Sequence, residues 1–325
     1  MTLLDVSHLT LRAGDTTLVD DATFALGAGE RVGLVGESGS GKSMTALAVL
    51  GLLPDAVVAT GSARLDGHEI VGSTDAATRR LRGPVAGIVF QEPLSALDPL
   101  MRVGRQIAEP LRRHRGLRGA DLREAVSRSL ADVSLVEARI VRAYPHELSG
   151  GQRQRVAIAI ALAADPRLLI ADEPTTALDV TIQAQILDLM KDLQRERKGS
   201  SVMLITHDLA VIAETCDRVI VMYGGRIQEV ARVTDLFDNP LHPYTQGLLG
   251  SIPTQASKGQ PLPLVEGNVP SIFNFPSGCR FRSRCPLAEE RCASEEPALR
   301  TLAHGHEVRC HLLESADVQT VETEA

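Results

Sequence analysis

The eight residues 36–43 could bind the phosphates of a nucleotide. They read Gly36, Glu37, Ser38, Gly39, Ser40, Gly41, Lys42 and Ser43, which fits the pattern G-x-x-x-x-G-K-[ST]. Three glycines let successive backbone N–H groups face one anion, and a helix starting near Lys42 would point its positive end at the same place. In this phosphate-binding loop (P-loop), Lys42 would reach the β- and γ-phosphates and the Ser43 hydroxyl would ligate Mg²⁺.

An acidic pair further along the chain could hold a metal ion and activate water. Asp172 and Glu173 follow the short apolar run 168–171, as at the end of a buried strand. Burying two carboxylates is costly unless a cation or a proton offsets their charge, which argues against a purely structural role. Asp172 would hold Mg²⁺ through its water shell, and Glu173 would polarise the water that attacks a phosphate.

Three more polar positions belong to the same pattern. Gln91 follows the strand-like run 85–90, the letters L-S-G-G-Q occupy residues 148–152, and His207 follows the strand-like run 201–206. A serine and adjacent glycines that open a helix form an anion site of their own, because the first N–H groups of the helix are unpaired. This second anion site cannot fold back on the distant P-loop of its own chain.

Strands that alternate with helices must bring these residues together. Strand-like runs cover residues 3–11, 17–26, 31–35, 61–67, 85–90, 168–171 and 201–206, and helix-like runs cover 103–113, 121–133, 153–164 and 180–197. The alternation predicts a mainly parallel sheet that binds its ligand at the carboxyl ends of the strands. We expect an α/β P-loop ATPase core with an N-terminal antiparallel β subdomain and a helical subdomain at about residues 91–165.

Composition limits the classes of function. The 325 residues carry a net charge of −7, which lacks the basic footprint of a nucleic-acid-binding protein. No apolar run approaches the roughly 20 residues that span a bilayer, and the N-terminus lacks the pattern of a secretory signal. We expect a cytosolic chain with a nucleotide-binding domain at 1–238, a proline-rich C-terminal extension at 239–313 and a disordered acidic tail at 314–325.

In their order along the chain, these motifs resemble the ATP-binding subunits of ABC transporters, over roughly the first three quarters of the sequence. The letters L-S-G-G-Q are that family's signature. In the family, two subunits face each other head to tail. The resemblance therefore implies ATP hydrolysis coupled to transport, with a signature that contacts the nucleotide on the partner's P-loop through Ser149, Gly150, Gly151 and Gln152.

The same resemblance implies roles for single residues. Gln91 would bind near Mg²⁺ and the attacking water and report to the membrane subunits, Asp179 would line the dimer contact, and His207 would grip the γ-phosphate opposite Glu173. One departure concerns the base: the family often stacks adenine on an aromatic ring between the first two strands, where this chain has Arg12, Ala13 and Gly14. How the adenine is recognised stays open.

A narrower resemblance, to the di- and oligopeptide importers and the related nickel importers, comes from residues 91–99, 239–245 and the cysteine-bearing end. It implies a peripheral subunit on the cytoplasmic face, paired with a second, related ATPase under two membrane permease subunits and an extracytoplasmic substrate-binding protein. Peptide, nickel chelate and other solutes stay open as cargo, as do homodimer and heterodimer. A soluble ABC ATPase without a transport role is the rival interpretation, although such proteins usually carry two cassettes.

Four cysteines gather near the end of the chain, at Cys279, Cys285, Cys292 and Cys310. In a reducing compartment they suggest a metal site, and their spacing is wider than the C-x₂₋₄-C pairs usual for structural zinc. Resemblance to dipeptide-importer ATPases implies a [4Fe–4S] cluster, with zinc and unligated thiols as alternatives. Because this region lies outside every nucleotide motif, we expect it to take no part in hydrolysis.

Overall fold

The computed structural model describes residues 2–175, 180–196, 200–252, 265–302 and 305–314. Asp179 and most of the acidic tail lie outside these ranges. Among the described residues, the strands form a four-stranded sheet in the order β2-β1-β4-β5 and an eight-stranded sheet in the order β11-β12-β10-β9-β3-β8-β7-β6. The fold class predicted from the sequence, an α/β core with an additional antiparallel sheet, is confirmed.

The smaller sheet is antiparallel in all its pairs. Its strands are β1 (Thr2–Ala13), β2 (Thr16–Gly27), β4 (Val57–Leu65) and β5 (His68–Glu69). Along β1, buried positions alternate at Leu4 and Val6 and then resume at Leu9 and Leu11, which reverses their parity. The register shifts there, and His8 adopts a φ of 53°, so a bulge keeps both halves of the strand facing the core.

The larger sheet is parallel at its centre and antiparallel at one edge. Its strands are β3 (Arg31–Val35), β6 (Ala86–Val89), β7 (Leu168–Asp172), β8 (Ser201–Thr206), β9 (Arg218–Tyr223), β10 (Arg226–Arg232), β11 (Arg300–Thr301) and β12 (Glu307–Val308). Strands β9, β3, β8, β7 and β6 run parallel to one another. Every residue of β7 and β8 is buried, as expected for strands covered on both faces.

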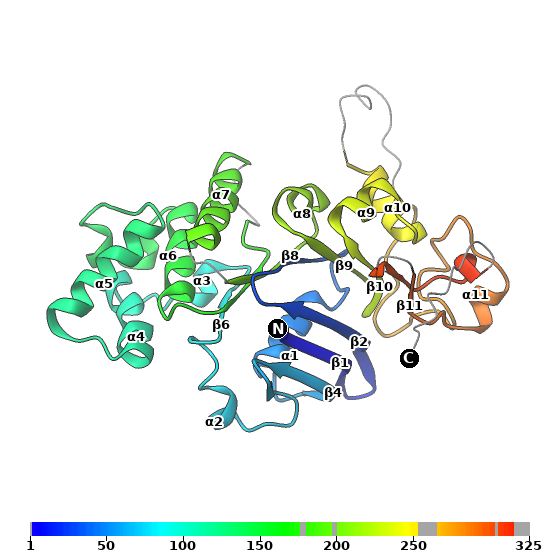
Figure 1. Ribbon diagram of the computed structural model, residues 1–325, viewed down its shortest axis with the longest axis horizontal. Coiled ribbons are helices and arrows are strands. Elements are labelled where there is room, and N and C mark those ends of the chain that lie inside the picture. The colour runs from blue at the N-terminus through cyan, green and yellow to red at the C-terminus, as the bar shows by residue number, and fades with distance from the viewer. Residues whose placement is uncertain (1, 176–179, 197–199, 253–264, 303–304, 315–325) are drawn as a thin grey trace, which may run out of the picture.

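Two hydrophobic cores cover the two faces of this sheet. Leu34 and Ile220 pack with residues of the antiparallel sheet, whereas their chain neighbours Val35 and Val221 pack with the helices on the other side. Figure 1 shows the resulting arrangement, with the antiparallel sheet and α1 below the larger sheet and a group of helices to the left. The alternation along each strand therefore divides the molecule into layers.

The helices are interspersed among the strands along the chain. They are α1 (Lys42–Val49), α2 (Asp75–Thr78), α3 (Pro93–Ala96), α4 (Val103–Arg115), α5 (Gly119–Asp132), α6 (Gly150–Leu162), α7 (Val180–Glu196), α8 (Leu209–Thr215), α9 (Val233–Asp238), α10 (Pro243–Gly250) and α11 (Arg291–Ser294), with short 3₁₀ turns η1 (Ile140–Arg142), η2 (Pro145–Glu147) and η5 (His311–Glu314). Between β6 and β7, helices α3 to α6 pack together around Ile107, Leu130 and Ile158.

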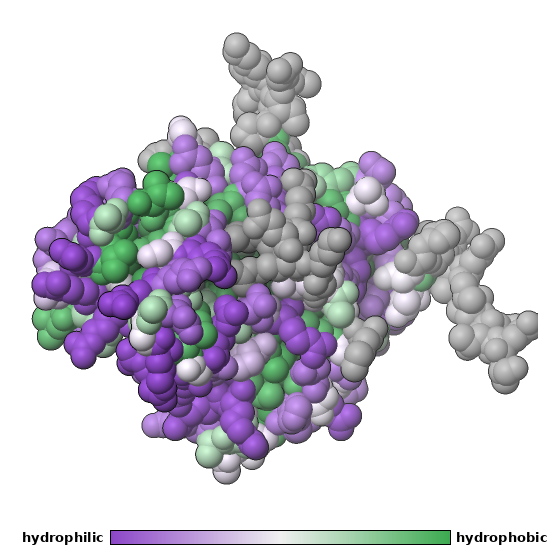
Figure 2. Space-filling view, turned by 60° about the vertical axis from the view of Figure 1, so that its left-hand side comes forward, coloured by the Kyte–Doolittle hydropathy of each residue, from purple (hydrophilic) through white to green (hydrophobic). Residues whose placement is uncertain are grey.

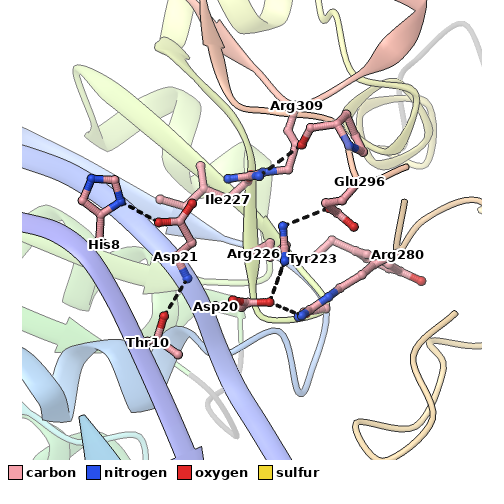
Figure 3. Close-up of polar contacts among 12 residues, drawn as sticks. His8, Thr10, Asp20, Asp21, Tyr223, Arg226, Ile227, Arg280, Glu296 and Arg309 are labelled. Carbon is pink, nitrogen blue, oxygen red and sulfur yellow. Dashed lines mark hydrogen bonds and ion pairs between the residues drawn. The ribbon is translucent and has the colours of Figure 1, made fainter. Parts of the chain in front are cut away.

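The C-terminal extension is joined to the core sheet. Strand β12 pairs with β10, and the buried Glu229 of β10 accepts hydrogen bonds from the N–H groups of Leu241 (2.8 Å) and His242 (3.1 Å) and lies 2.7 Å from Nε2 of His306. In a second set of contacts, Asp20 of β2 pairs with Arg226 of β10 and with Arg280, and Arg226 also pairs with Glu296 (Figure 3). The sequence predicts an appended region here, and the structure shows that this region extends the sheet.

One face of the molecule is drawn in Figure 2, and it mixes hydrophilic and hydrophobic side chains. Figure 2, which brings the helical side forward, shows hydrophobic patches interrupted by hydrophilic ones. In the ranges that the structure describes, no helix combines the length and the apolar character that crossing a membrane requires.

Candidate functional site

The P-loop connects the end of β3 to the start of α1, as the sequence predicts. A Cβ atom on Gly36 would lie 2.1 Å from the carbonyl oxygen of Met222, so only glycine fits where the loop leaves the sheet. Gly41 precedes α1 with a φ of 97°, a left-handed conformation that glycine adopts without strain. These two glycines turn the chain so that α1 starts directly against the loop.

Lys42 lies across the inside of this loop. Its ammonium group donates hydrogen bonds to the carbonyl oxygens of Gly36 (2.7 Å) and Glu37 (3.0 Å) and to the hydroxyl of Ser40 (3.4 Å). Burial lowers the pKa of Lys42, and the neighbouring carboxylates of Glu173, Asp172 and Glu37 oppose this effect. A cation held at the centre of a loop in this way can bind the phosphates of a nucleotide.

Ser43 and Asp172 lie beside the loop and offer oxygen ligands. The Ser43 hydroxyl donates a hydrogen bond of 3.1 Å to the Asp172 carboxylate at the end of β7. Asp172 is 7 % exposed, and burial raises its pKa, which means that its charged form lacks full compensation. A hydroxyl and a buried carboxylate are the donors that Mg²⁺ prefers, so these residues fit that ion.

Glu173 meets residues from both neighbouring strands. Nε2 of Gln91, just beyond β6, donates to a Glu173 carboxylate oxygen at 3.0 Å, and Nδ1 of His207, just beyond β8, lies 3.6 Å from the other oxygen. Glu173 itself has a φ of 44°, and its N–H group donates to the carbonyl oxygen of Ile205 at 2.9 Å. A non-glycine residue in this conformation is strained, which is typical of functional positions.

The structure thus brings four of the predicted positions together at the carboxyl edge of the sheet. Asp172 ends a strand of the parallel part, and Gln91, Glu173 and His207 follow such strands, next to the P-loop that follows β3. The side chain of Glu173 is 16 % exposed and that of His207 is 64 % exposed. A phosphate bound in the P-loop would therefore lie near one partly buried carboxylate and one accessible imidazole.

The signature residues occupy a different part of the molecule. Ser149 caps α6: its hydroxyl accepts from the N–H group of Gln152 (3.3 Å), and its own N–H group donates to the Gln152 side chain (3.1 Å). A Cβ atom on Gly151 would lie 2.8 Å from Ile182 of α7, so α6 and α7 approach closely there. Figure 1 shows α6 among the helices beside the sheets, apart from α1.

Two contacts to the P-loop come from the C-terminal extension, and sequence analysis missed both. The N–H group of Glu37 donates to the Tyr244 hydroxyl at 2.9 Å, and the Glu37 carboxylate accepts two hydrogen bonds from Arg284, at 2.6 and 3.1 Å. The extension therefore contacts the P-loop directly, whereas its predicted lack of a part in hydrolysis stays a prediction. The available signals were indirect: Tyr244 lies in the importer-like stretch 239–245, and Arg284 precedes Cys285.

The four C-terminal cysteines are free thiols that line one cavity of about 10 Å³. That volume holds roughly one water molecule, and no group of three or more His, Cys, Asp or Glu side chains able to hold a metal ion occurs within the described ranges. Burial raises the pKa of Cys279 to about 12 and raises those of Cys285 and Cys310 as well. Arranged in this way, the thiols do not fit a [4Fe–4S] cluster, and the iron–sulfur prediction is not supported.

Comparison with known proteins agrees with this geometry. The ABC transporter family matches residues 19–176, and the family described as "Oligopeptide/dipeptide transporter, C-terminal region" matches residues 228–292. The dimeric structure of a post-hydrolysis state of the ATP-binding cassette MJ0796, bound to ADP and Pi, is 31 % identical with a TM-score of 0.63, and the match covers 71 % of this chain and 98 % of that one.

Curated relatives match nearly the whole sequence. The oligopeptide transport ATP-binding protein AppD of Bacillus subtilis is 46 % identical over 320 residues, which are 96 % of this chain and 97 % of that protein. The oligopeptide transport ATP-binding protein OppD of Salmonella typhimurium is 48 % identical over 285 residues, which are 87 % of this chain and 85 % of that protein. This chain therefore belongs to the ATP-binding proteins of the ABC transporter family, in the group that also carries the oligopeptide/dipeptide transporter C-terminal region.

Proposed function

We propose that this chain is the ATP-hydrolysing subunit that powers oligopeptide import through a membrane ABC transporter. The observation that carries the proposal is the P-loop beside Asp172 and Glu173, in one chain with a C-terminal region that matches peptide transporters. Relatives of nearly equal length are named as oligopeptide transport ATP-binding proteins, which favours peptide over nickel or another solute as cargo.

The site residues suggest how hydrolysis proceeds. The P-loop and Lys42 would bind the phosphates of ATP, and Ser43, Asp172 and Gln91 would hold Mg²⁺, which supplies positive charge to the triphosphate. Glu173 would take the proton of the water that attacks the γ-phosphorus, while the bond to the leaving ADP oxygen breaks. His207 would stabilise the charge on the transferring group, and Gln91 would orient Glu173 through their hydrogen bond.

A second cassette would complete each site. The exposed Ser149, with Gly150, Gly151 and Gln152 at the start of α6, is presented away from the chain's own P-loop and would face the nucleotide of a partner. Asp179 would line the same contact and lies outside the described residues. The matched MJ0796 cassette was solved as a dimer, which supports this arrangement.

The assembly that we propose places the chain at the cytoplasmic face of the membrane. Its partners would be a related but different ATPase, two permease subunits and an extracytoplasmic substrate-binding protein. Within the chain, we propose a nucleotide-binding domain at residues 1–238, with its helical subdomain at about 91–165, and an extension at 239–313. The extension matches the peptide-transporter family, so we assign it to this branch of transporters.

Transport in reconstituted vesicles tests the proposed function. The chain is coexpressed with its candidate permease subunits, the complex is placed in lipid vesicles with the binding protein, and uptake of labelled short peptides and of Ni²⁺ is followed. We expect peptide accumulation that requires ATP and Mg²⁺, and none with a complex that carries Glu173→Gln. Uptake of Ni²⁺ without uptake of peptide, or a chain that purifies without any membrane subunit, would contradict the proposal.

The [4Fe–4S] cluster stays a separate proposal, which the convergence of four thiols on one cavity supports and the small size of that cavity opposes. To hold a cluster, the cavity between the four thiols would have to be larger than about 10 Å³. Anaerobic purification followed by iron and acid-labile sulfide assays shows whether the four cysteines hold a cluster or remain without one. If the cluster exists, we expect about four irons and four sulfides per chain. Zinc in their place, or four alkylated thiols without iron, would contradict the cluster.

A further inference from the structure

Glu37, the second residue of the P-loop, is held by a buried arginine of the C-terminal extension. Arg284 has only 4 % of its side chain exposed and pairs with the Glu37 carboxylate through two parallel hydrogen bonds. Its remaining donors reach the carbonyl oxygens of Val265 (3.1 Å) and Glu266 (2.9 Å). An arginine fixed on both sides in this way sets the position of its partner carboxylate.

A second connection leads from the same segment to the other side of the P-loop. Arg280 donates to the carbonyl oxygen of Gly224 and to Asp20, the latter contact being visible in Figure 3. The next residue of that turn, Gly225, donates its N–H group to the carbonyl oxygen of Ser40 at 3.2 Å. Arg284 thus supports the second residue of the P-loop directly. Arg280, four positions earlier, supports its fifth residue, Ser40, through the turn at Gly224 and Gly225.

The segment that carries these arginines is itself firmly packed. Phe281, between them, is 1 % exposed, and its ring lies 5.2 Å from that of Tyr223 and 5.4 Å from that of Tyr244. Tyr244 also accepts the hydrogen bond of the Glu37 N–H group. The backbone of Glu37 is therefore held by a member of this aromatic cluster, and its side chain by Arg284, whose guanidinium carbon lies 5.7 Å from the centre of the Tyr223 ring.

The charge of Glu37 gives this support a consequence for nucleotide binding. A free carboxylate in the P-loop would repel the phosphates that the loop binds, and partial burial strengthens such repulsion because the medium screens it less than water does. Arg284 neutralises the carboxylate and holds it in place. Without Arg284, the loop would keep the negative charge and lose a restraint on its shape.

We propose that Arg284 is a positioning residue of the ATP site, which acts through Glu37 so that the affinity for ATP depends on the C-terminal extension. This goes beyond the hydrolysis mechanism, which uses no residue of the extension. Arg284 is not a catalytic residue, because it reaches the nucleotide only through its partner in the P-loop.

The test uses the full chain and Mg²⁺ with a fluorescent ATP analogue. We expect Arg284→Met to raise the dissociation constant about 10-fold, which is close to 1.4 kcal/mol. In the assembled transporter, the KM for ATP should rise by a similar factor while kcat changes less than twofold, because the reacting groups are untouched. Arg284→Lys keeps the positive charge but cannot form the two parallel hydrogen bonds. Its dissociation constant should therefore lie between those of the parent chain and Arg284→Met.

A matched control and a double-mutant cycle separate this role from general destabilisation. Arg291→Met removes an arginine of the same extension that pairs with Glu295 on the exposed surface of α11, and it should leave ATP binding unchanged. If Arg284 acts through Glu37, adding Arg284→Met to a chain that already carries Glu37→Gln should raise the dissociation constant of the analogue by less than twofold.

Two outcomes would overturn the proposal. One is a folded Arg284→Met chain that binds the analogue as tightly as the parent chain. The other is a loss that is undiminished in the Glu37→Gln background, since Arg284 would then act on something else. If circular dichroism shows that Arg284→Met does not fold, Tyr244→Phe replaces it, because that change removes only the hydroxyl that holds the Glu37 N–H group. It should weaken binding severalfold, and unchanged binding would count against the proposal.

Discussion

Replacing Glu173 by glutamine is expected to slow ATP hydrolysis by about 10²–10⁴-fold while ATP binding is kept. The amide has nearly the same shape and can still contact Gln91 and His207, but it cannot accept the proton of the attacking water. The P-loop and Lys42, which bind the phosphates, are unchanged. The measurement is steady-state phosphate release by the assembled transporter, beside the dissociation constant of an ATP analogue.

A surface glutamate provides the matched control for this substitution. Glu214 lies on α8 with 72 % of its side chain exposed, so Glu214→Gln should hydrolyse ATP at the parental rate. In a complex whose second ATPase is inactivated, hydrolysis by Glu173→Gln within about threefold of the parent chain would show that another group accepts the proton, because losing a general base costs far more than that.

Replacing Ser149 by arginine is expected to stop hydrolysis of the ATP that is bound on the P-loop of the partner ATPase. The arginine would fill the surface that faces the partner's nucleotide, and losing one preorganised donor to a transition state already costs about 10²–10³ in rate. This chain's own P-loop should bind ATP normally, because α6 and α1 lie apart. Comparing analogue binding by the single chain with phosphate release by the full complex measures both effects.

The control for this experiment is Ser127→Arg, which places the same side chain on the exposed face of α5. It should leave phosphate release unchanged. Should a strictly monomeric preparation hydrolyse ATP as fast as the complex, or should Ser149→Arg weaken ATP binding in the single chain, the head-to-tail arrangement would have to be abandoned.

Local patterns in the sequence predicted the parallel core and the edge where its polar residues meet. The apolar run 168–171 ends in two carboxylates, and the structure places both at the end of β7, next to His207 after β8. Such predictions succeed because a buried strand needs a continuous apolar run and its carboxyl end opens onto the ligand edge of the sheet.

The contacts of the extension could not be predicted in the same way. Strands β11 and β12 have two residues each, too few to show an alternation, and Arg284 pairs with a glutamate 247 positions away. The cysteines show a different limit: their spacing indicates a shared purpose but not how far apart the sulfur atoms lie. Neither the short strands nor the cysteine spacing shows that Phe281 packs against Tyr223, and this contact between distant parts of the chain brings the extension to the P-loop.

The long separation between Arg284 and Glu37 has a consequence for how the protein is made. A ribosome that adds about 5–20 residues per second reaches Arg284 some 10–50 s after Glu37, over the 247 positions between them. Strand β12 and His306 follow Arg284 in the sequence, so the buried Glu229 of β10 can bond to Leu241 and His242 before His306 is made. The nascent P-loop therefore lacks the Arg284 contact until residue 284 has been made, and on the proposal above its full affinity for ATP is not reached before then.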